Sequence, residues 1–327
     1  MQIRLQSIFL LILILLVGCT NMGGGSSEEL TQVRLALPFR PDIQFAPFYV
    51  AIAEGYFNDV GLDVQIEHYP ENEAMTLVGA SEVPFAVVSG EQVLLARAQE
   101  LPVVYVTAWW QDYPVAVAVP EESDIVDPGD LVGRKVGIPG LYGASYIGYR
   151  ALLSATGVSE SDTILDSIGY NQVEAMLAGQ EDAVVIYANN EPVQLEAQGM
   201  PMRLIKVADY VSLASNGLIT NESLLEDDPE LVEAMIAAML RGIEAVMEDP
   251  DAAYEISKGY VEGLDQADES IMKKVLNESI VFWRADRIGE SDPTAWSNMN
   301  EILIEMGLLD EGQSVHDAYT NEFLPKQ

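Results

Sequence analysis

Short apolar runs with strand-like alternation recur along this chain, separated by segments with helical spacing. Residues 33–37 alternate and stop at Pro38, and residues 62–66 alternate directly after Gly61. Between them, residues 45–55 place their large apolar side chains on one helical face. Strands that alternate with helices are typical of βαβ units, whose sheets are mostly parallel. The pattern therefore predicts an α/β fold.

Further predicted strands and helices alternate in the same way along the chain. A second unit is expected to start after Pro120, with a helix over residues 144–155. From Pro229 onward the pattern becomes helical, and three Asp-Pro pairs each combine an N-cap acid with proline at the first helical position. Additional strands are predicted at residues 85–88, 103–106, 115–119, 135–139, 183–187 and 203–207.

The N-terminus carries an export signal. An apolar run over residues 8–17 is shorter than the roughly 20 residues that span a bilayer. It ends in Leu-Val-Gly-Cys, which resembles a bacterial lipobox, with Cys19 as the residue that accepts lipid. An uncleaved membrane anchor is the alternative. We expect a signal peptide over residues 1–18, a lipid-anchored flexible tether over residues 19–30, and residence at the extracytoplasmic face of the cell membrane.

Composition narrows the remaining chemistry. Cys19 is the single cysteine, so the mature domain is expected to lack disulfides and thiol chemistry. Two histidines, His68 and His316, offer little for a metal site or a general base. The 52 acidic and 16 basic residues give a net charge of −36, which argues against nucleic acid. No catalytic residue, metal site or cofactor is predicted.

One stretch of sequence resembles a known family. Residues 46–57 (APFYVAIAEGYF), continued by residues 60–64 (VGLDV), are similar to the riboflavin and thiamine-pyrimidine branch of the ABC-transporter solute-binding proteins, the NMT1/THI5-like group. Residues 133–139 (GRKVGIP), Asn-Glu-Pro at 190–192 and residues 249–253 also match, so the resemblance covers nearly the whole mature chain. Sulfonate and nitrate binders share much of this pattern.

The resemblance implies the two-lobed, type II periplasmic-binding-protein fold, with two mixed or parallel sheets flanked by helices. Lobe 1 would hold residues 31–119 plus 219–327, and lobe 2 residues 120–218. Crossovers near residues 119–121 and 212–218 would form a hinge, and the ligand would bind in the cleft between the lobes. The expected partners of this monomer are a small molecule, an ABC permease with its ATPase, and a membrane only through the lipid anchor.

Candidate contacts lie where loops follow the predicted strands, because ligands of open α/β sheets bind at the carboxyl ends of strands. Aromatic rings there can stack on a flat ligand, while amides and acids pair with its N–H and C=O groups. The candidates are Arg40, Asp42, Phe45, Ser89, Glu91, Trp109, Trp110, Tyr142, Ser145, Tyr187, Asn189 and Glu191.

Several candidates have an alternative, structural role. One of Trp109 and Trp110 could lie in the core instead of the cleft, and Tyr142 could pack with Tyr146 on a helix face. Glu191 could stabilise the hinge, and Arg40 could be a surface residue. Residues 143–145 could hold an anion through free N–H groups, although no Lys or Arg lies within that loop.

The favoured function is capture of a heteroaromatic vitamin, riboflavin first and a thiamine pyrimidine precursor second, for delivery to a permease. Sulfonate or nitrate binding is less favoured, because such anions call for a polar or cationic pocket. Fungal enzymes that make a thiamine pyrimidine resemble this fold, but their cysteine-rich motif has no counterpart here. A surface sensor or adhesin on the same scaffold is the third class.

Overall fold

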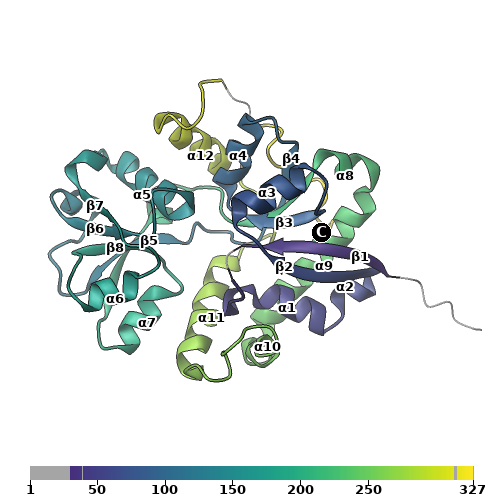
Figure 1. Ribbon diagram of the computed structural model, residues 1–327, viewed down its shortest axis with the longest axis horizontal. Helices are drawn as coiled ribbons and strands as arrows, with labels where there is room; N and C mark the ends of the chain where they lie inside the picture. The colour runs from purple at the N-terminus through teal and green to yellow at the C-terminus, as the bar shows by residue number, and fades with distance from the viewer. Residues whose placement is uncertain (1–29, 39, 313–314, 327) are drawn as a thin grey trace, which may run out of the picture.

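A computed structural model describes residues 30–38, 40–312 and 315–326. The predicted signal peptide, Cys19 and all of the tether except Leu30 lie outside the described residues. Two five-stranded sheets stand side by side, and each is flanked by its own helices (Figure 1). The expected type II, two-lobed fold is confirmed.

The first sheet has the order β2-β1-β3-β10-β4. The strands β1, β2 and β3 are parallel, whereas β10 is antiparallel to both β3 and β4. All four residues of β3 and all six of β4 are buried, as expected for strands covered on both faces. The bounds are β1 (Thr31–Leu37), β2 (Leu62–His68), β3 (Phe85–Val88), β4 (Val103–Ala108) and β10 (Gly217–Asn221).

Helices from both ends of the chain cover this sheet. Each Asp-Pro pair begins a helix as predicted, since Asp228, Asp249 and Asp292 accept hydrogen bonds from backbone N–H groups of their own first turns. The bounds are η1 (Ile43–Phe45), α1 (Ala46–Ala53), α2 (Tyr56–Asp59), α3 (Glu71–Gly79), α4 (Gly90–Ala98), α8 (Glu222–Asp227), α9 (Pro229–Glu248), α10 (Pro250–Ser257), α11 (Glu269–Trp283) and α12 (Pro293–Glu305).

The second sheet has the order β7-β6-β8-β5-β9. Here β6 is parallel to β7 and β8, and β5 is antiparallel to β8 and β9. The strands are β5 (Val115–Pro120), β6 (Lys135–Ile138), β7 (Ile164–Ser167), β8 (Ala183–Tyr187) and β9 (Met202–Lys206). The helices are η2 (Pro128–Leu131), α5 (Gly143–Thr156), η3 (Glu160–Asp162), α6 (Gln172–Leu177), α7 (Glu191–Ala197) and η4 (Val207–Asp209).

The position of β5 corrects the predicted domain boundary. Residues 115–119 were assigned to the first lobe, but β5 pairs with β8 and β9 of the second sheet. The first crossover is therefore residues 109–114, and the second is residues 210–216, just before β10 returns to the first sheet. The alternation of an apolar run predicts a strand but carries no information on which sheet receives it.

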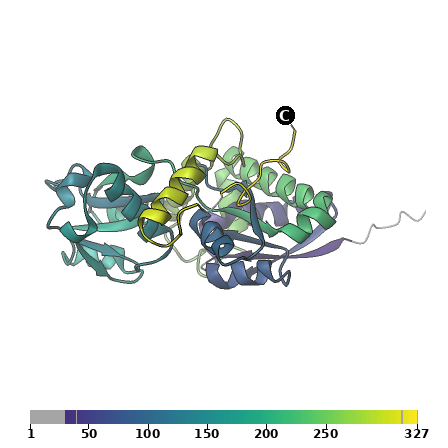
Figure 2. The same cartoon turned by 90° about the horizontal axis from the view of Figure 1, so that it is seen from above.

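Two helices of the C-terminal third lie across the boundary between the lobes. Helix α12 packs on α4 of the first lobe and on α5 of the second, and Figure 2 shows it spanning both. Helix α11 contacts η1 on one side and α7 on the other. Among the described residues, no helix combines the length and apolarity needed to cross a membrane.

Candidate functional site

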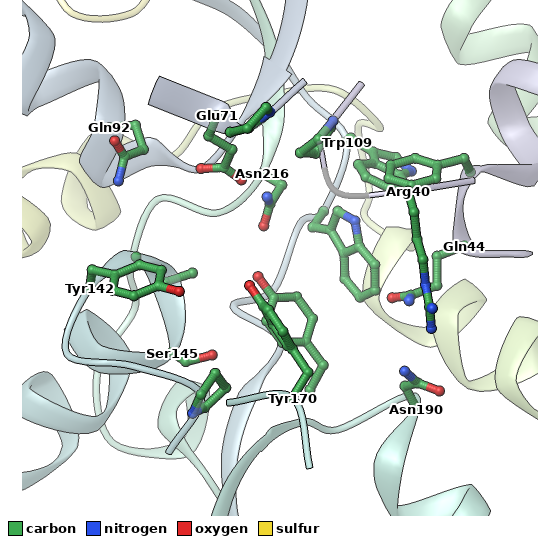
Figure 3. A pocket seen from close by; sticks show the side chains of 18 of the residues that line it. Arg40, Gln44, Glu71, Gln92, Trp109, Tyr142, Ser145, Tyr170, Asn190 and Asn216 are labelled. Atoms are coloured by element: carbon green, nitrogen blue, oxygen red, sulfur yellow. The ribbon is translucent and has the colours of Figure 1, made fainter. Parts of the chain in front are cut away.

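A cavity of about 850 Å³ lies between the lobes. Its walls come from the first lobe, from the second lobe and from both crossovers (Figure 3). Pockets that bind drug-sized ligands have volumes of about 300–1,000 Å³, so the cavity can hold a multi-ring small molecule. We call it the cleft.

Aromatic side chains form the back of the cleft. Trp109 stacks on Phe45 with ring centroids 5.2 Å apart and an interplanar angle of 26°. Trp110 meets Tyr187 nearly at right angles, at 6.2 Å. Trp109 and Trp110 are only 3% and 2% exposed, yet both line the cavity. Both backbone N–H groups donate to the carbonyl of Asn216, so the two crossovers are tied together behind these rings.

Two tyrosines of the second lobe line the cleft with their rings largely uncovered. Tyr142 is 67% exposed and Tyr170 is 66% exposed, which is unusual for large side chains unless they serve a contact surface. The Tyr142 ring lies over Gly140, where an added Cβ would come within 2.4 Å of a ring carbon. Glycine at position 140 therefore permits this ring position. Both rings are available to cover a ligand.

The structure brings together eight of the twelve candidates. Arg40, Phe45, Trp109, Trp110, Tyr142, Ser145, Tyr187 and Glu191 line the cleft. The other four, Asp42, Ser89, Glu91 and Asn189, do not line it but hydrogen-bond to cleft residues from behind. The prediction that these four residues lie near the cleft is therefore useful. However, a loop that follows a strand has one side facing the cleft and one side buried, and the sequence pattern does not distinguish the two sides.

Asn189 and Asp42 fix the orientation of Gln44, a cleft residue. The Ser279 hydroxyl donates to the Val275 carbonyl at 2.8 Å, so its oxygen accepts from Asn189 Nδ2 at 2.9 Å. Asn189 Nδ2 also donates to Gln44 Oε1 at 2.8 Å, and Gln44 Nε2 donates to Asp42 Oδ1 at 3.1 Å. Gln44 keeps one amide hydrogen outside this chain of bonds. The arrangement makes Gln44 a hydrogen-bond donor to the cleft.

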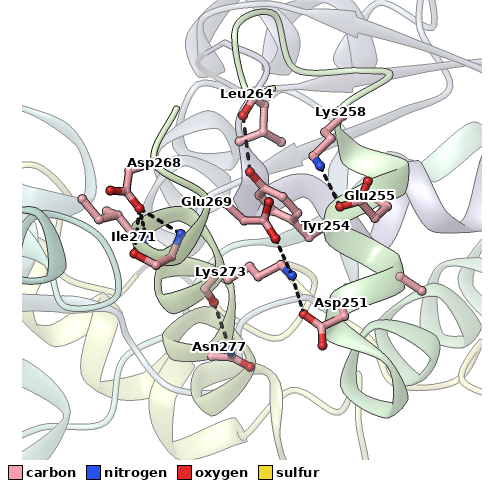
Figure 4. A network of polar contacts seen from close by, with 12 residues as sticks. Asp251, Tyr254, Glu255, Lys258, Leu264, Asp268, Glu269, Ile271, Lys273 and Asn277 are labelled. Carbon is pink, nitrogen blue, oxygen red and sulfur yellow. Dashed lines mark hydrogen bonds and ion pairs between the residues drawn. The ribbon is translucent and has the colours of Figure 1, made fainter. Parts of the chain in front are cut away.

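Helix α11, which carries Ser279, is held against α10 by a charged network (Figure 4). Lys273 pairs with Asp251 at 2.7 Å and with Glu269 at 2.8 Å. Its ammonium also lies 5.3 Å from the centre of the Tyr254 ring, and Lys258 lies 4.8 Å from the same ring. Hydrogen bonds to the two carboxylates raise the pKa of Lys273. The lysine thereby links α11, which packs on η1, to α10, which packs on α1.

We expect Lys273→Met to lower the melting temperature, because Asp251 and Glu269 would lose the cation between them in a chain that is already strongly acidic. Lys258→Met is the matched control, since Lys258 caps the end of α10 and its ion pair is with Glu255, three residues earlier, rather than with α11. Differential scanning calorimetry at low and high salt would measure the effect, and salt should reduce the loss caused by Lys273→Met. An equal loss in both variants would contradict the linking role.

Buried carboxyls are the main electrostatic feature of the cleft. Burial raises the pKa of Glu191 to about 7, although backbone N–H groups, including that of Tyr187, oppose the shift. Burial likewise raises the pKa of Glu91 to about 7, and the neighbouring Glu71 adds to this rise. Burial also raises the pKa of Glu71, which lines the cleft. A wall of this kind favours ligands that donate hydrogen bonds and disfavours anions.

Several cleft residues were missed by the sequence reasoning. Glu71 follows β2 as the predicted contacts follow other strands, so the same argument would have found it. Tyr170 follows β7, which is exposed at both ends and half-buried between them, so its four residues gave no clear strand pattern. The remaining missed polar residues are Gln44, Asn72, Gln92, Asn190 and Asn216. Among the described residues, no group of three His, Cys, Asp or Glu side chains could hold a metal ion.

Two lobes, two crossovers and a cleft between them define a solute-binding protein of the ABC-transporter type. The aliphatic sulphonate-binding protein SsuA of Escherichia coli has the same fold, with a TM-score of 0.73 at 13% identity over 90% of this chain and 94% of its own. Residues 42–253 match the family model described as NMT1/THI5 like. The chain belongs to the NMT1/THI5-like family.

Two relatives match almost end to end. The riboflavin-binding protein RibY of Chloroflexus aurantiacus is 34% identical over 99% of both chains. The formylaminopyrimidine-binding protein of Halalkalibacterium halodurans is 28% identical over 95% of this chain and 96% of its own. The same comparison returns 4-amino-5-hydroxymethyl-2-methylpyrimidine phosphate synthases from fungi and Legionella pneumophila, at 24–26% identity.

Proposed function

We propose that this protein captures riboflavin in the cleft and delivers it to an ABC permease. The observation that carries the proposal is the aromatic wall, in which Phe45, Trp109, Trp110, Tyr142, Tyr170 and Tyr187 surround one cavity. Flat, extended ring systems bind to such walls by stacking. The full-length similarity to a riboflavin-binding protein supports this choice of ligand.

The polar part of the cleft supports a neutral ligand. Of the described residues that line the cleft, one, Arg40, is a Lys or Arg, whereas Glu71 and Glu191 bring carboxyls. A sulfonate or nitrate would need more donors and cations than this wall provides. A thiamine pyrimidine precursor is the second candidate, because the formylaminopyrimidine-binding relative matches over nearly the whole chain.

We further propose that the chain is exported, cut before Cys19 and held at the extracytoplasmic face of the membrane by lipid on that cysteine. The anchor would keep the carrier near its permease. A catalytic role is not part of this proposal, since the described residues of the cleft offer stacking and hydrogen-bonding groups and include neither cysteine nor histidine. Mass spectrometry of the protein purified from membranes should show a diacyl or triacyl mass increment that Cys19→Ser removes.

The ligand is tested by titrating riboflavin with the purified soluble domain. Stacking against the cleft aromatics should quench riboflavin fluorescence at a one-to-one ratio, and mass spectrometry of co-purified material should find a flavin. Tight binding of a formylaminopyrimidine without flavin quenching would favour the second candidate and reject riboflavin.

Trp110→Ala should weaken riboflavin binding by roughly 1–3 kcal/mol, because a central aromatic contact would be lost. Trp296→Phe is the control, since Trp296 stacks on Tyr319 in the core of the first lobe and does not line the cleft. Isothermal titration calorimetry gives both affinities. An unchanged affinity for Trp110→Ala would assign this ring to the core alone.

A further inference from the structure

Three side chains on the first-lobe side of the cleft form a chain of short oxygen contacts. Ser89 Oγ lies 2.6 Å from Glu71 Oε2 and 2.6 Å from Glu91 Oε1. Two oxygens at such a distance share a proton, because without one their lone pairs repel. A serine hydroxyl supplies a single proton. The second contact therefore requires a proton on one of the two carboxyls.

The hydrogen-bond partners indicate which carboxyl carries it. Both carboxyls lie in the first turn of a helix, where helix N–H groups favour a negative charge, so the helices do not distinguish them. Glu71 Oε2 in addition accepts from the backbone N–H of Ser89 at 3.3 Å. Glu91 is fully buried, and its Oε2 has no partner among the described residues. An unpartnered buried oxygen costs far less on a neutral acid than on a carboxylate. Glu91 is thus the acid, and Glu71 the carboxylate.

Among the residues that the structure describes, no Lys or Arg forms an ion pair with Glu71. The titratable groups that face the pair are Tyr113 of the first crossover, Tyr187 of β8 and Tyr170, which follows β7. Burial raises the pKa of all three tyrosines, and charge on the carboxyls adds to the rise, so they stay neutral. Arg40 lies apart from Glu71 in Figure 3. The charge on Glu71 is therefore available to a ligand.

We propose that Glu71 receives a hydroxyl or ring N–H donor of the ligand, and that a proton held on Glu91 and relayed by Ser89 keeps Glu71 in its acceptor form. Figure 3 shows the Glu71 carboxyl directed into the cleft beside Asn216. The proposal rests on the binding function proposed above and adds a chemical class, a neutral ligand with at least one strong donor. Glu91 and Ser89 act through Glu71 and are positioning residues.

The first test is a riboflavin titration at pH 6 with Glu71→Gln and Glu73→Gln. Glu71→Gln should weaken binding at least tenfold, because a neutral amide oxygen is a weaker acceptor than a carboxylate and the new N–H groups face the ligand's donor. Glu73 lies on the same helix turn but is exposed and outside the cleft, so Glu73→Gln should bind as the wild type does. Equal affinity for Glu71→Gln and the wild type would overturn the proposal.

The second test separates the relay from a merely structural role. Above about pH 7 the wild-type affinity should fall by up to tenfold per pH unit, because Glu91 loses its proton and ligand binding would enclose two charges. Glu91→Gln should have a shallower profile than the wild type, since its amide N–H can donate to Ser89 at every pH while Glu191, whose pKa burial also raises to about 7, still titrates in the cleft. A profile for Glu91→Gln that follows the wild type would contradict the relay.

A third measurement does not depend on the identity of the ligand. The infrared difference between the ligand-free wild type and Glu91→Gln at pH 6 should show one protonated carboxylic acid band, because the subtraction removes the signal of Glu191, whose pKa is also about 7. If the wild type binds no riboflavin but shows this band, the proposed ligand fails while the protonation of Glu91 stands. Absence of the band overturns the present proposal even if riboflavin binds.

Discussion

The free energy of unfolding should decline as the pH rises from about 5 to 8, and Glu91→Gln should remove about 3 kcal/mol of that decline. Burial raises the pKa of Glu91 from 4.5 to about 7 in the folded state. Between these two pH values the folded chain binds a proton that the unfolded chain releases, so each unit of pH costs about 1.4 kcal/mol. Glutamine cannot ionise, so its contribution to the free energy of unfolding does not change with pH.

Chemical denaturation at several pH values would measure this effect as a difference between variant and wild type. The difference matters because burial also raises the pKa of Glu191 to about 7, so that carboxyl titrates in the same range in both proteins. Glu73→Gln serves as the matched control, since this exposed carboxyl lies on α3 near Glu71. Its curve should run parallel to the wild type. A Glu91→Gln curve that also runs parallel would show that Glu91 is ionised in the folded protein.

The second large effect is expected at Asn189. Asn189→Asp should destabilise the protein by about 3–5 kcal/mol at pH 8, because a fully buried carboxylate would face Gln44 Oε1 where an amide now donates. The loss should shrink as the pH falls, since a protonated acid can donate a single hydrogen bond. Riboflavin affinity should fall as well, because Gln44 would lose the partner that orients it.

Asn190→Asp is the matched control, because it makes the same chemical change one residue further along. Asn190 is partly exposed at the N-cap of α7, and its Oδ1 accepts from Gln194 at 2.8 Å, which a carboxylate can also do. Its free energy of unfolding should change by no more than about 0.5 kcal/mol. Comparable losses at both positions would mean that the chain from Ser279 to Gln44 contributes little to stability.

Helices and strands could be predicted where the spacing of apolar residues was regular over a long segment. They could not be predicted where the segment was short or its spacing ambiguous. The Asp-Pro pairs gave three helix starts, because an acid N-cap and an N1 proline act locally. The strand β10 was missed because it begins with Gly217 and has only two large apolar residues, Leu218 and Ile219. Its glycine is required by packing, since a Cβ there would lie 2.1 Å from the Tyr105 ring.

The residues of the site could be predicted where they lie in loops that follow the carboxyl ends of strands. That rule brought Phe45, Trp110 and Tyr187 to one cavity from three distant parts of the sequence. It could not tell Glu71, which faces the cleft, from Glu91, which is buried behind it, because burial depends on packing between α3 and α4. Local sequence predicts which residues lie near the ends of the strands. Tertiary packing then determines which of those side chains face the cleft.

The helix α12 has a mechanical consequence for the cleft. It packs on both α4 and α5, and Ser154 of α5 donates a 2.5 Å hydrogen bond to Glu305 near its end. Any rotation that parts the lobes must slide this rigid helix over one of its two neighbours. The angular range of opening is therefore limited by a segment outside the crossovers. The length of α12 and its packing on α4 and α5 would therefore set how far the two lobes can separate.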